Sequence, residues 1–175
     1  MATTEIITGE RADLLQALGS RRYFLRFTVR DLTDEQAAAR PTASELSLGG
    51  LLKHVADTER QWFDFIQRGP VAMATGADGK AWNMDDWLAN FHMTADDTLE
   101  GLLANYQAVA DRTDQLIREL PDLGVSHPLP EAPWYEPGAW WSARRVLLHL
   151  IGETAQHAGH ADIIRETIDG AKSMG

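Results

Sequence analysis

The sequence predicts an all-α fold, a four-helix bundle whose helices are joined by long loops. Four long stretches repeat apolar residues at the three-to-four-residue spacing of an amphipathic helix. Alternating β-branched runs bounded by hairpin dipeptides hardly occur, so strand signals are poor. Helices of this length, joined by two long loops and one shorter one, are typical of a four-helix bundle. A chain of 175 residues supports one sizeable core but not two, so we expect a single domain over residues 1–175.

The first half of the chain contains two of the predicted helices. The first runs from about Glu10 to Arg30, and the second from near Ser47 to Gly69, where Pro70 adds a strong stop signal. In the connection between them, the Thr33–Gln36 segment resembles a capping box that opens a short extra turn.

The second half contains the other two helices. We expect the third from Thr94 to Leu120, because Asp97 completes a pair like a capping box with Thr94. Ser142 is the predicted N-cap of the last helix, which ends near Gly170. The two long connections, at about residues 70–93 and 121–141, exceed the ~12 residues beyond which loops tend to be functional or to carry short structure of their own.

Composition excludes several classes of function. The formal net charge of −10 argues against nucleic acid or an anionic membrane surface as partner, because both favour a basic patch. The absence of cysteine restricts any metal to His, Asp or Glu ligands, and any thiol chemistry to an external thiol. The N-terminus does not resemble a signal peptide, and no apolar run approaches the ~18 residues of a membrane span, so we expect a cytoplasmic protein.

The most informative stretch lies in the last predicted helix. At ~100° per residue, with His149 at 0°, Glu153 falls near 40°, His157 near 80° and His160 near 20°. All four therefore share one narrow face of a segment whose apolar residues mark it as a core helix: Leu148, Ile151, Ile163 and Ile164. A buried carboxylate or imidazole is costly unless it is hydrogen-bonded, ion-paired or bound to a metal.

A metal site is one interpretation of this stripe. Glu153 and His157 stand four residues apart, so their side chains can meet at one point, and His54 of the second helix is the natural third ligand. Two imidazoles and one carboxylate suffice for a catalytic divalent site, with zinc the first choice and nickel, iron or manganese also suited. The alternatives are an ordinary ion pair for Glu153 and His157, and a core-edge histidine for His54. We expect Asp57 and Glu59 on an exposed acidic face, from which one of them could orient the His54 ring.

The remaining histidines receive lesser roles. His160 is expected to support the site or to pack rather than to bind the metal, because catalytic sites keep one position open. His149 is expected to be structural or to line the pocket, and His92 and His127 to be solvated loop or cap residues.

Three segments, Leu51–His54, Trp140–Arg145 and Glu153–His160, resemble the DinB-like superfamily, most closely its actinobacterial branch of uncharacterised domains. That superfamily also holds the metal-binding domain of mycothiol-dependent maleylpyruvate isomerase and the thiol S-transferases that use mycothiol or bacillithiol. The resemblance covers nearly the whole chain. It implies an up-down-down-up four-helix bundle with long loops and a divalent metal held between its helices.

The resemblance also implies a ligand set and an activity. The histidine of the second helix corresponds to His54, and the family's Glu and His four residues apart correspond to Glu153 and His157. Many relatives have His in place of that Glu, so Glu153 favours the isomerase-like ligand set. The isomerase has an extra C-terminal domain that contributes to its substrate site and has no counterpart in this sequence, so isomerase activity is not expected. Relatives commonly dimerise through bundle faces, which leaves a homodimer open.

The implied chemistry is metal activation of a low-molecular-weight thiol of the mycothiol type, which then attacks a small electrophile in the mouth of the bundle. Arg144, Arg145 and the tryptophans would frame the substrate pocket, although loop tryptophans more often cover core ends: Trp82, Trp87, Trp134, Trp140 and Trp141. A metal-dependent S-transferase or related detoxification enzyme is therefore the first hypothesis. The alternatives are a metal-binding stress-response module without turnover, and a purely structural bundle whose polar stripe is a salt-bridge network.

Overall fold

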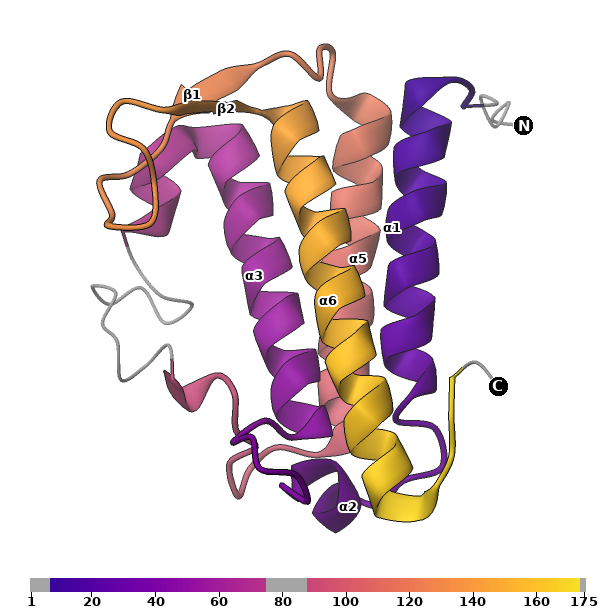
Figure 1. The fold of residues 1–175 in the computed structure, drawn as a ribbon. Helices are drawn as coiled ribbons and strands as arrows, with labels where there is room; N and C mark the ends of the chain where they lie inside the picture. The colour runs from indigo at the N-terminus through magenta and orange to yellow at the C-terminus, as the bar shows by residue number, and fades with distance from the viewer. Residues whose placement is uncertain (1–6, 75–87, 174–175) are drawn as a thin grey trace.

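The computed structural model describes residues 7–74 and 88–173 and shows a bundle of four long helices (Figure 1). These are α1 (Glu10–Phe27), α3 (Leu48–Arg68), α5 (Leu99–Glu119) and α6 (Ala143–Asp169). The short helix α2 (Asp34–Ala38) follows α1, and the 3-10 helix η1 (Gly69–Met73) follows α3. Helices α1 and α6 run in one direction and α3 and α5 in the other, so the topology is up-down-down-up. The all-α prediction is confirmed.

Most helix ends lie where the sequence places them, because side chains satisfy the free backbone groups there. The Thr33 capping box begins α2, with both reciprocal bonds present. Ser47 accepts a hydrogen bond from the Gly50 amide to begin α3, and Ser142 accepts one from the Arg145 amide to begin α6. Gly170 ends α6 with a left-handed backbone, φ 78°, which a residue without a Cβ adopts readily.

Helix α1 ends at Phe27, three residues before the predicted end at Arg30. The Thr28 hydroxyl donates to the Leu25 carbonyl, and the buried guanidinium of Arg165 on α6 donates to the carbonyls of Thr28 and Arg30, at 2.7 Å each. The chain leaves the helix here because these carbonyls turn toward Arg165.

Helix α5 begins at Leu99, five residues after the predicted start at Thr94. The Asp97 carboxylate does accept a hydrogen bond from the Thr94 amide, at 2.7 Å, but it also pairs with Lys53 of α3, at 2.9 Å. The pair therefore closes a separate turn against α3, and Thr98 caps the helix instead by accepting from the Gly101 amide.

The segment expected as a loop at 121–141 contains a small antiparallel hairpin. Strand β1 (Ser126–Pro128) pairs with β2 (Trp140–Ser142), with His127 opposite Trp141. Strands of three residues are too short to show alternation in the sequence, which explains the omission. Of the tryptophans expected around the pocket, Trp82 and Trp87 lie outside the described residues.

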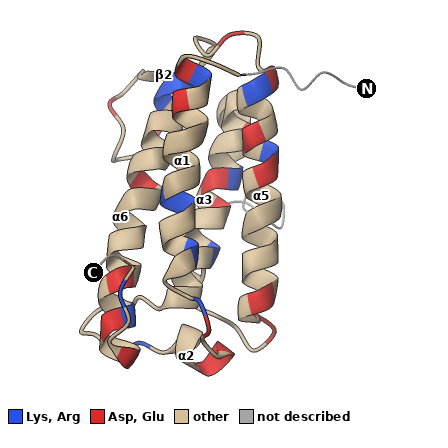
Figure 2. Ribbon diagram, turned by 90° about the vertical axis from the view of Figure 1, so that its right-hand side faces the viewer, with Lys and Arg blue, Asp and Glu red and all other residues tan. Residues whose placement is uncertain are grey.

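Buried apolar residues form two clusters, one toward each end of the bundle. Charged side chains separate them: Arg22 lies between Leu18 and Leu25 on α1, Glu59 between Ala56 and Trp62 on α3, and Glu153 between Leu150 and Ala158 on α6. We call Arg22, Glu59 and Glu153 the polar layer. Figure 2 shows how acidic and basic residues are distributed along the helices.

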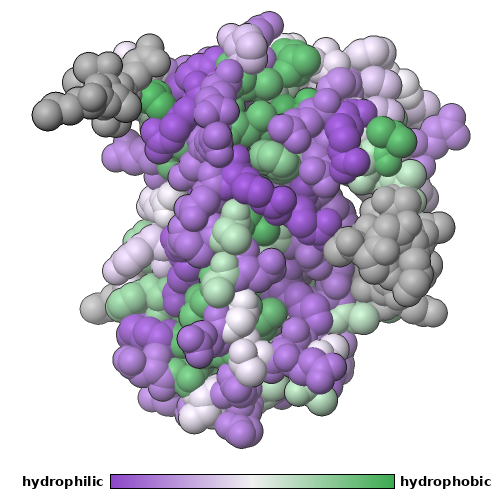
Figure 3. All heavy atoms as spheres, turned by 180° about the vertical axis from the view of Figure 1, so that it is seen from behind, coloured by the Kyte–Doolittle hydropathy of each residue, from purple (hydrophilic) through white to green (hydrophobic). Residues whose placement is uncertain are grey.

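The face of the molecule in Figure 3 is mostly hydrophilic, as expected when the apolar residues are buried in the two clusters. Hydrophilic residues dominate the face opposite that of Figure 1, and hydrophobic residues there form separate patches (Figure 3). Two residues expected to mark the core side of α6 instead face outward, Leu148 with 52% and Ile163 with 63% of its surface exposed. No helix in the described part of the chain is long and apolar enough to cross a membrane.

Candidate metal centre

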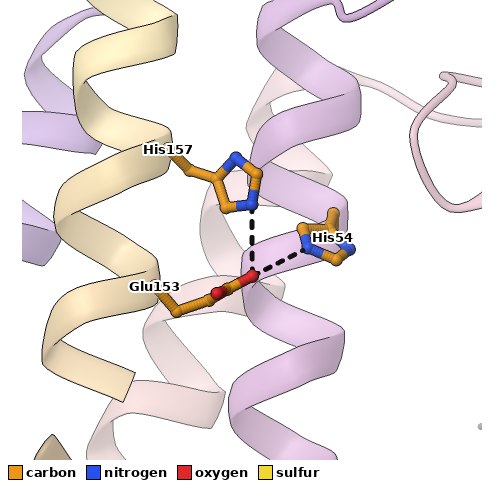
Figure 4. A group of neighbouring side chains, drawn as sticks. All are labelled: His54, Glu153 and His157. Atoms are coloured by element: carbon orange, nitrogen blue, oxygen red, sulfur yellow. Dashed lines mark hydrogen bonds and ion pairs between the residues drawn. The ribbon is translucent and has the colours of Figure 1, made fainter. Parts of the chain in front are cut away.

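Three side chains predicted as ligands from the sequence converge between α3 and α6. His54 comes from α3, and Glu153 and His157 come from successive turns of α6 (Figure 4). One oxygen of Glu153, Oε1, lies 3.4 Å from His54 Nε2 and 3.2 Å from His157 Nε2. Each residue offers a ligand atom, and these atoms all lie within 4.8 Å of one another. The three residues that the sequence predicted as metal ligands therefore lie in one group in the fold.

The spacing of these atoms fits a divalent cation. Two ligand atoms that each lie about 2.1 Å from one cation at a tetrahedral angle are about 3.4 Å apart, which matches the two observed distances. The group offers imidazole nitrogens and a carboxylate, a donor set suited to zinc and to other first-row divalent metals. Both histidines are buried, with 6% and 8% of their surface exposed, so their rings are held by packing.

The carboxylate of the group is ionised. Hydrogen bonds from His157 and then from His54 hold the pKa of Glu153 well below its usual range, and they outweigh the opposing effect of its partial burial. The group therefore presents an anionic oxygen flanked by two imidazoles. This is the protonation state in which a carboxylate binds a metal.

His160 contacts the His157 ring on the side away from Glu153 Oε1, through the other ring nitrogen. Its Nδ1 atom lies 3.4 Å from Nδ1 of His157, one turn away on α6. When His157 uses Nε2 as a ligand, its Nδ1 carries the hydrogen and can donate to His160. Such a contact fixes the tautomer and orientation of a ligating imidazole, which is the supporting role expected from the sequence.

The residues predicted to frame the substrate pocket differ in their surroundings. Trp141 packs on Trp62, with ring centroids 4.8 Å apart and planes 14° from parallel, and the Arg145 guanidinium lies 4.2 Å from the Trp141 ring centroid. Because the two partners cannot share one side of the ring at these distances, both faces of Trp141 are covered. Arg144 lies at the end of the bundle, where its guanidinium is hydrogen-bonded to Glu10 of α1.

His149 lies one turn before Glu153 on α6, between the candidate metal group and the stacked rings of Trp62 and Trp141. Its ring meets the edges of Trp62 and Trp141 at centroid distances of 5.1 and 5.2 Å. Burial lowers the pKa of His149, which favours the neutral imidazole. It is therefore half-buried between the aromatic stack and the candidate metal group.

Two expectations about acidic residues near His54 are settled by the structure. Glu59 is fully buried rather than on an exposed face, because it pairs with Arg22 of α1 through both carboxylate oxygens. Asp57 is half-buried rather than exposed, and it pairs with Arg60 at 3.0 Å. Arg22 also reaches Asp114 of α5, at 2.7 Å, so the buried pair joins three helices.

Two histidines expected to be solvated are half-buried. His127 donates from Nε2 to the Ile66 carbonyl, at 3.1 Å, and packs edge-on against Phe65. His92 has its Nδ1 atom buried. Both lie in connections whose packing depends on distant residues, so no local sequence pattern could have predicted their burial.

Two cavities in the described residues lie away from the candidate metal group. One of about 430 Å³ is lined by the loop 129–138, and one of about 320 Å³ lies beside Arg11 and Arg144 at the end of the bundle. Neither is lined by a residue of the group.

The fold and the family match define a class of protein, the helical bundles of the DinB-like superfamily, and this member carries a group of side chains that could hold a metal. The sequence pattern of the mycothiol-S-transferase family matches residues 13–170, and the chain belongs to that family. The crystal structure of a conserved protein from Enterococcus faecalis superimposes with a TM-score of 0.71, covering 94% of this chain and 100% of that one. At 14% identity this likeness shows the fold alone. A comparison with curated proteins found no match.

Proposed function

We propose that this protein is a metal-dependent S-transferase that joins a low-molecular-weight thiol of the mycothiol type to a small electrophile. The observation that carries the proposal is the convergence of His54, Glu153 and His157 in a chain of the mycothiol-S-transferase family. These three residues would hold a divalent cation, with zinc the first choice. A cation bound there lowers the pKa of a thiol and so supplies a nucleophile at neutral pH.

The residues of this chain prepare that chemistry in three ways. Glu153 would supply the negative charge, and the two imidazoles, one from α3 and one from α6, would hold the cation between the helices. Three protein ligands leave coordination positions for substrate. In the overall reaction the thiol loses its proton, its sulfur bonds to the electrophilic carbon, and the leaving group departs with the bonding electrons while the proton passes to solvent.

We further propose that Arg145 binds an anionic group of the electrophile. Arg145 is exposed, makes no ion pair among the described residues and is held in place by the face of Trp141. It lies eight residues before Glu153, which is two turns or ~12 Å along the axis of α6. Trp141 then acts as a support for Arg145 rather than as a stacking surface. Arg144 belongs to the predicted binding set as well, but its pairing with Glu10 leaves Arg145 as the better-placed cation.

Turnover tests the proposal. Protein loaded with zinc is incubated with mycothiol or bacillithiol and with a bimane or a chloronitrobenzene, and conjugate is measured by chromatography. We expect conjugation that requires both metal and thiol and is lost in His54→Ala. Stoichiometric metal without conjugation by any thiol would favour the binding module, and failure to bind metal under any loading condition would favour the structural bundle.

The role of Arg145 is tested by paired electrophiles. For a carboxylate-bearing electrophile, Arg145→Ala should raise KM about 10-fold, because a charge-assisted hydrogen bond contributes about 1.5–3 kcal/mol. The KM for a neutral analogue should stay unchanged, and Arg144→Ala, the matched control, should alter neither. Equal effects of Arg145→Ala on both electrophiles would argue against an anion-binding role.

Three finer expectations stay predictions: zinc as the native metal, a cytoplasmic location and a single domain over residues 1–175. A homodimer also stays open, and light scattering of the purified protein measures it directly.

A further inference from the structure

The first turn of α3 carries two residues without side chains on the side that contacts the segment 88–98. Gly49 and Gly50 are adjacent and buried within the helix. A helical glycine costs about 1 kcal/mol relative to alanine, so two in succession indicate that something approaches the backbone closely. A Cβ at Gly50 would lie 1.8 Å from the Phe91 carbonyl oxygen, and a Cβ at Gly49 would lie 2.1 Å from the Met93 sulfur. The main chain at Phe91 therefore packs directly on the α3 backbone.

A second contact fixes the same segment one turn further along α3. Lys53 pairs with Asp97 at 2.9 Å and donates to the His92 carbonyl at 3.4 Å. Asp97 in turn accepts from the Thr94 amide. The segment is thus attached to α3 at two places, by close backbone packing and by a partly buried ion pair.

The attachment places an aromatic ring on a candidate ligand. His54 follows Gly50 by four residues, so the two lie on the same side of α3. The Phe91 ring stacks on the His54 imidazole with centroids 4.1 Å apart and planes 24° from parallel. The His157 ring meets His54 edge-on, at 4.9 Å and 80°. The His54 ring plane is therefore determined by one stacked and one perpendicular neighbour.

We propose that Phe91, held by the close approach of its backbone to Gly50, is a positioning residue for the metal centre. By covering one face of His54 it keeps Nε2 directed at Glu153 and keeps water from that side of the ring. The inference rests on the proposed metal-binding function and adds to it a determinant of affinity that is not itself a ligand. Gly50 is then required by the metal centre and not only by the packing of the helix.

The two glycines provide a matched pair of variants. In Gly50→Ala the new methyl group meets a backbone carbonyl, which can move only if the whole segment shifts and takes the Phe91 ring with it. In Gly49→Ala the methyl group meets mainly Sδ and Cγ of the flexible Met93 side chain, which can adopt another rotamer. Gly50→Ala should therefore weaken metal binding, and Gly49→Ala should leave it near wild type.

The experiment measures binding of Zn²⁺ by competition with a chromophoric chelator, and the visible absorption spectrum of the Co²⁺-loaded protein. We expect Phe91→Leu and Gly50→Ala to weaken Zn²⁺ binding about 10-fold, the lower end of the effect of residues that orient metal ligands. Both should change the Co²⁺ spectrum, and Phe91→Tyr, which restores a flat ring, should recover both properties. Tyr23→Ala, which removes an exposed aromatic ring on α1, should change neither.

The outcomes separate this inference from the function on which it rests. Wild-type protein that binds no Zn²⁺ would overturn the metal centre and the role of Phe91 together. Wild-type protein that binds Zn²⁺ and loses it in His54→Ala, with Phe91→Leu and Gly50→Ala unchanged in affinity and spectrum, would overturn the role of Phe91 alone. Melting of the metal-free variants identifies loss of fold, and if Gly50→Ala fails to fold, Phe91→Leu and its recovery by Phe91→Tyr decide the matter.

Discussion

The buried ion pair of Arg22 and Glu59 allows a prediction with a definite magnitude. Replacing Glu59 with Gln removes the negative charge and leaves the Arg22 guanidinium, 2% exposed, with Asp114 as its remaining charged partner. Removing one member of a buried pair typically costs 3–5 kcal/mol, because the other charge is left uncompensated. Asp114 remains within 2.7 Å of Arg22 but is one-third exposed, so its compensation is partial. We therefore expect a loss near the lower end, about 3 kcal/mol.

The assay is equilibrium unfolding of the metal-free protein in urea. With a urea dependence of about 2 kcal/mol/M, typical for a domain of this size, the midpoint should fall by about 1.5 M. The double variant Arg22→Met, Glu59→Leu removes both charges, and it should lie close to wild type because apolar replacements of buried pairs are often neutral. Glu45→Gln removes the partner of Arg40 in an exposed pair and should cost under about 1 kcal/mol.

Two results would refute this reasoning. A loss below about 1 kcal/mol in Glu59→Gln would mean that the pair is solvated rather than buried. A double variant as unstable as the single one would mean that the loss comes from packing at Glu59 and not from the uncompensated guanidinium.

The remaining predictions concern the metal and pH. Zn²⁺ at about a thousandfold excess over its Kd should stabilise the wild type by about 4 kcal/mol. Glu153→Gln should abolish the accompanying rise in Tm, whereas His160→Ala should reduce Zn²⁺ affinity only about 10-fold. Equal losses of affinity in the two variants would contradict the assigned roles. Partial burial of Asp97 raises its pKa, but hydrogen bonds from Thr94 and Lys53 outweigh this and leave the pKa lowered. The stabilisation from Asp97 is therefore complete above its unfolded pKa of about 3.9 and is lost as pH falls through the lower folded value. Urea midpoints between pH 3 and 6 should fall less steeply toward acid in Asp97→Asn than in wild type, and parallel profiles would disprove the contribution.

Local patterns in the sequence predicted most of the fold. Thr33, Ser47 and Ser142 each precede a backbone amide that their side chains can reach, so the starts of three helices follow from residues three positions apart. The start of α5 was mistaken because Thr94 and Thr98 both offer a cap. Lys53, which is distant in sequence, draws Asp97 toward α3 and decides between them.

The candidate site was predicted as a group, but its surroundings were not. The spacing of Glu153 and His157 and the position of His54 sufficed to bring the three together. Phe91 lies in a connection without periodicity, and only the adjacent Gly49 and Gly50 hinted that something packs against α3 there.

The buried charge of Glu59 did have a signal in the sequence. At ~100° per residue from Leu51, Glu59 falls near 80°, within the apolar stripe of its helix. Arg22 falls near 80° from Leu14 by the same measure. Two opposite charges within apolar stripes on neighbouring helices predict a buried pair. The assignment of Glu59 to an exposed face was wrong because it relied on residue type rather than on angle.

Glu153 belongs both to the candidate metal group and to the polar layer, so cation binding would bear on the cohesion of the bundle. Glu153 lies where the two apolar clusters are separated, so α3 and α6 have their least apolar packing at that level. A cation held by His54, Glu153 and His157 would connect the two helices there by coordination bonds. With a cation bound, separating α3 from α6 at mid-height would require breaking at least one of these coordination bonds. A cation bound as proposed would therefore also hold α3 against α6 at mid-height, and its affinity would influence how often the two helices separate there.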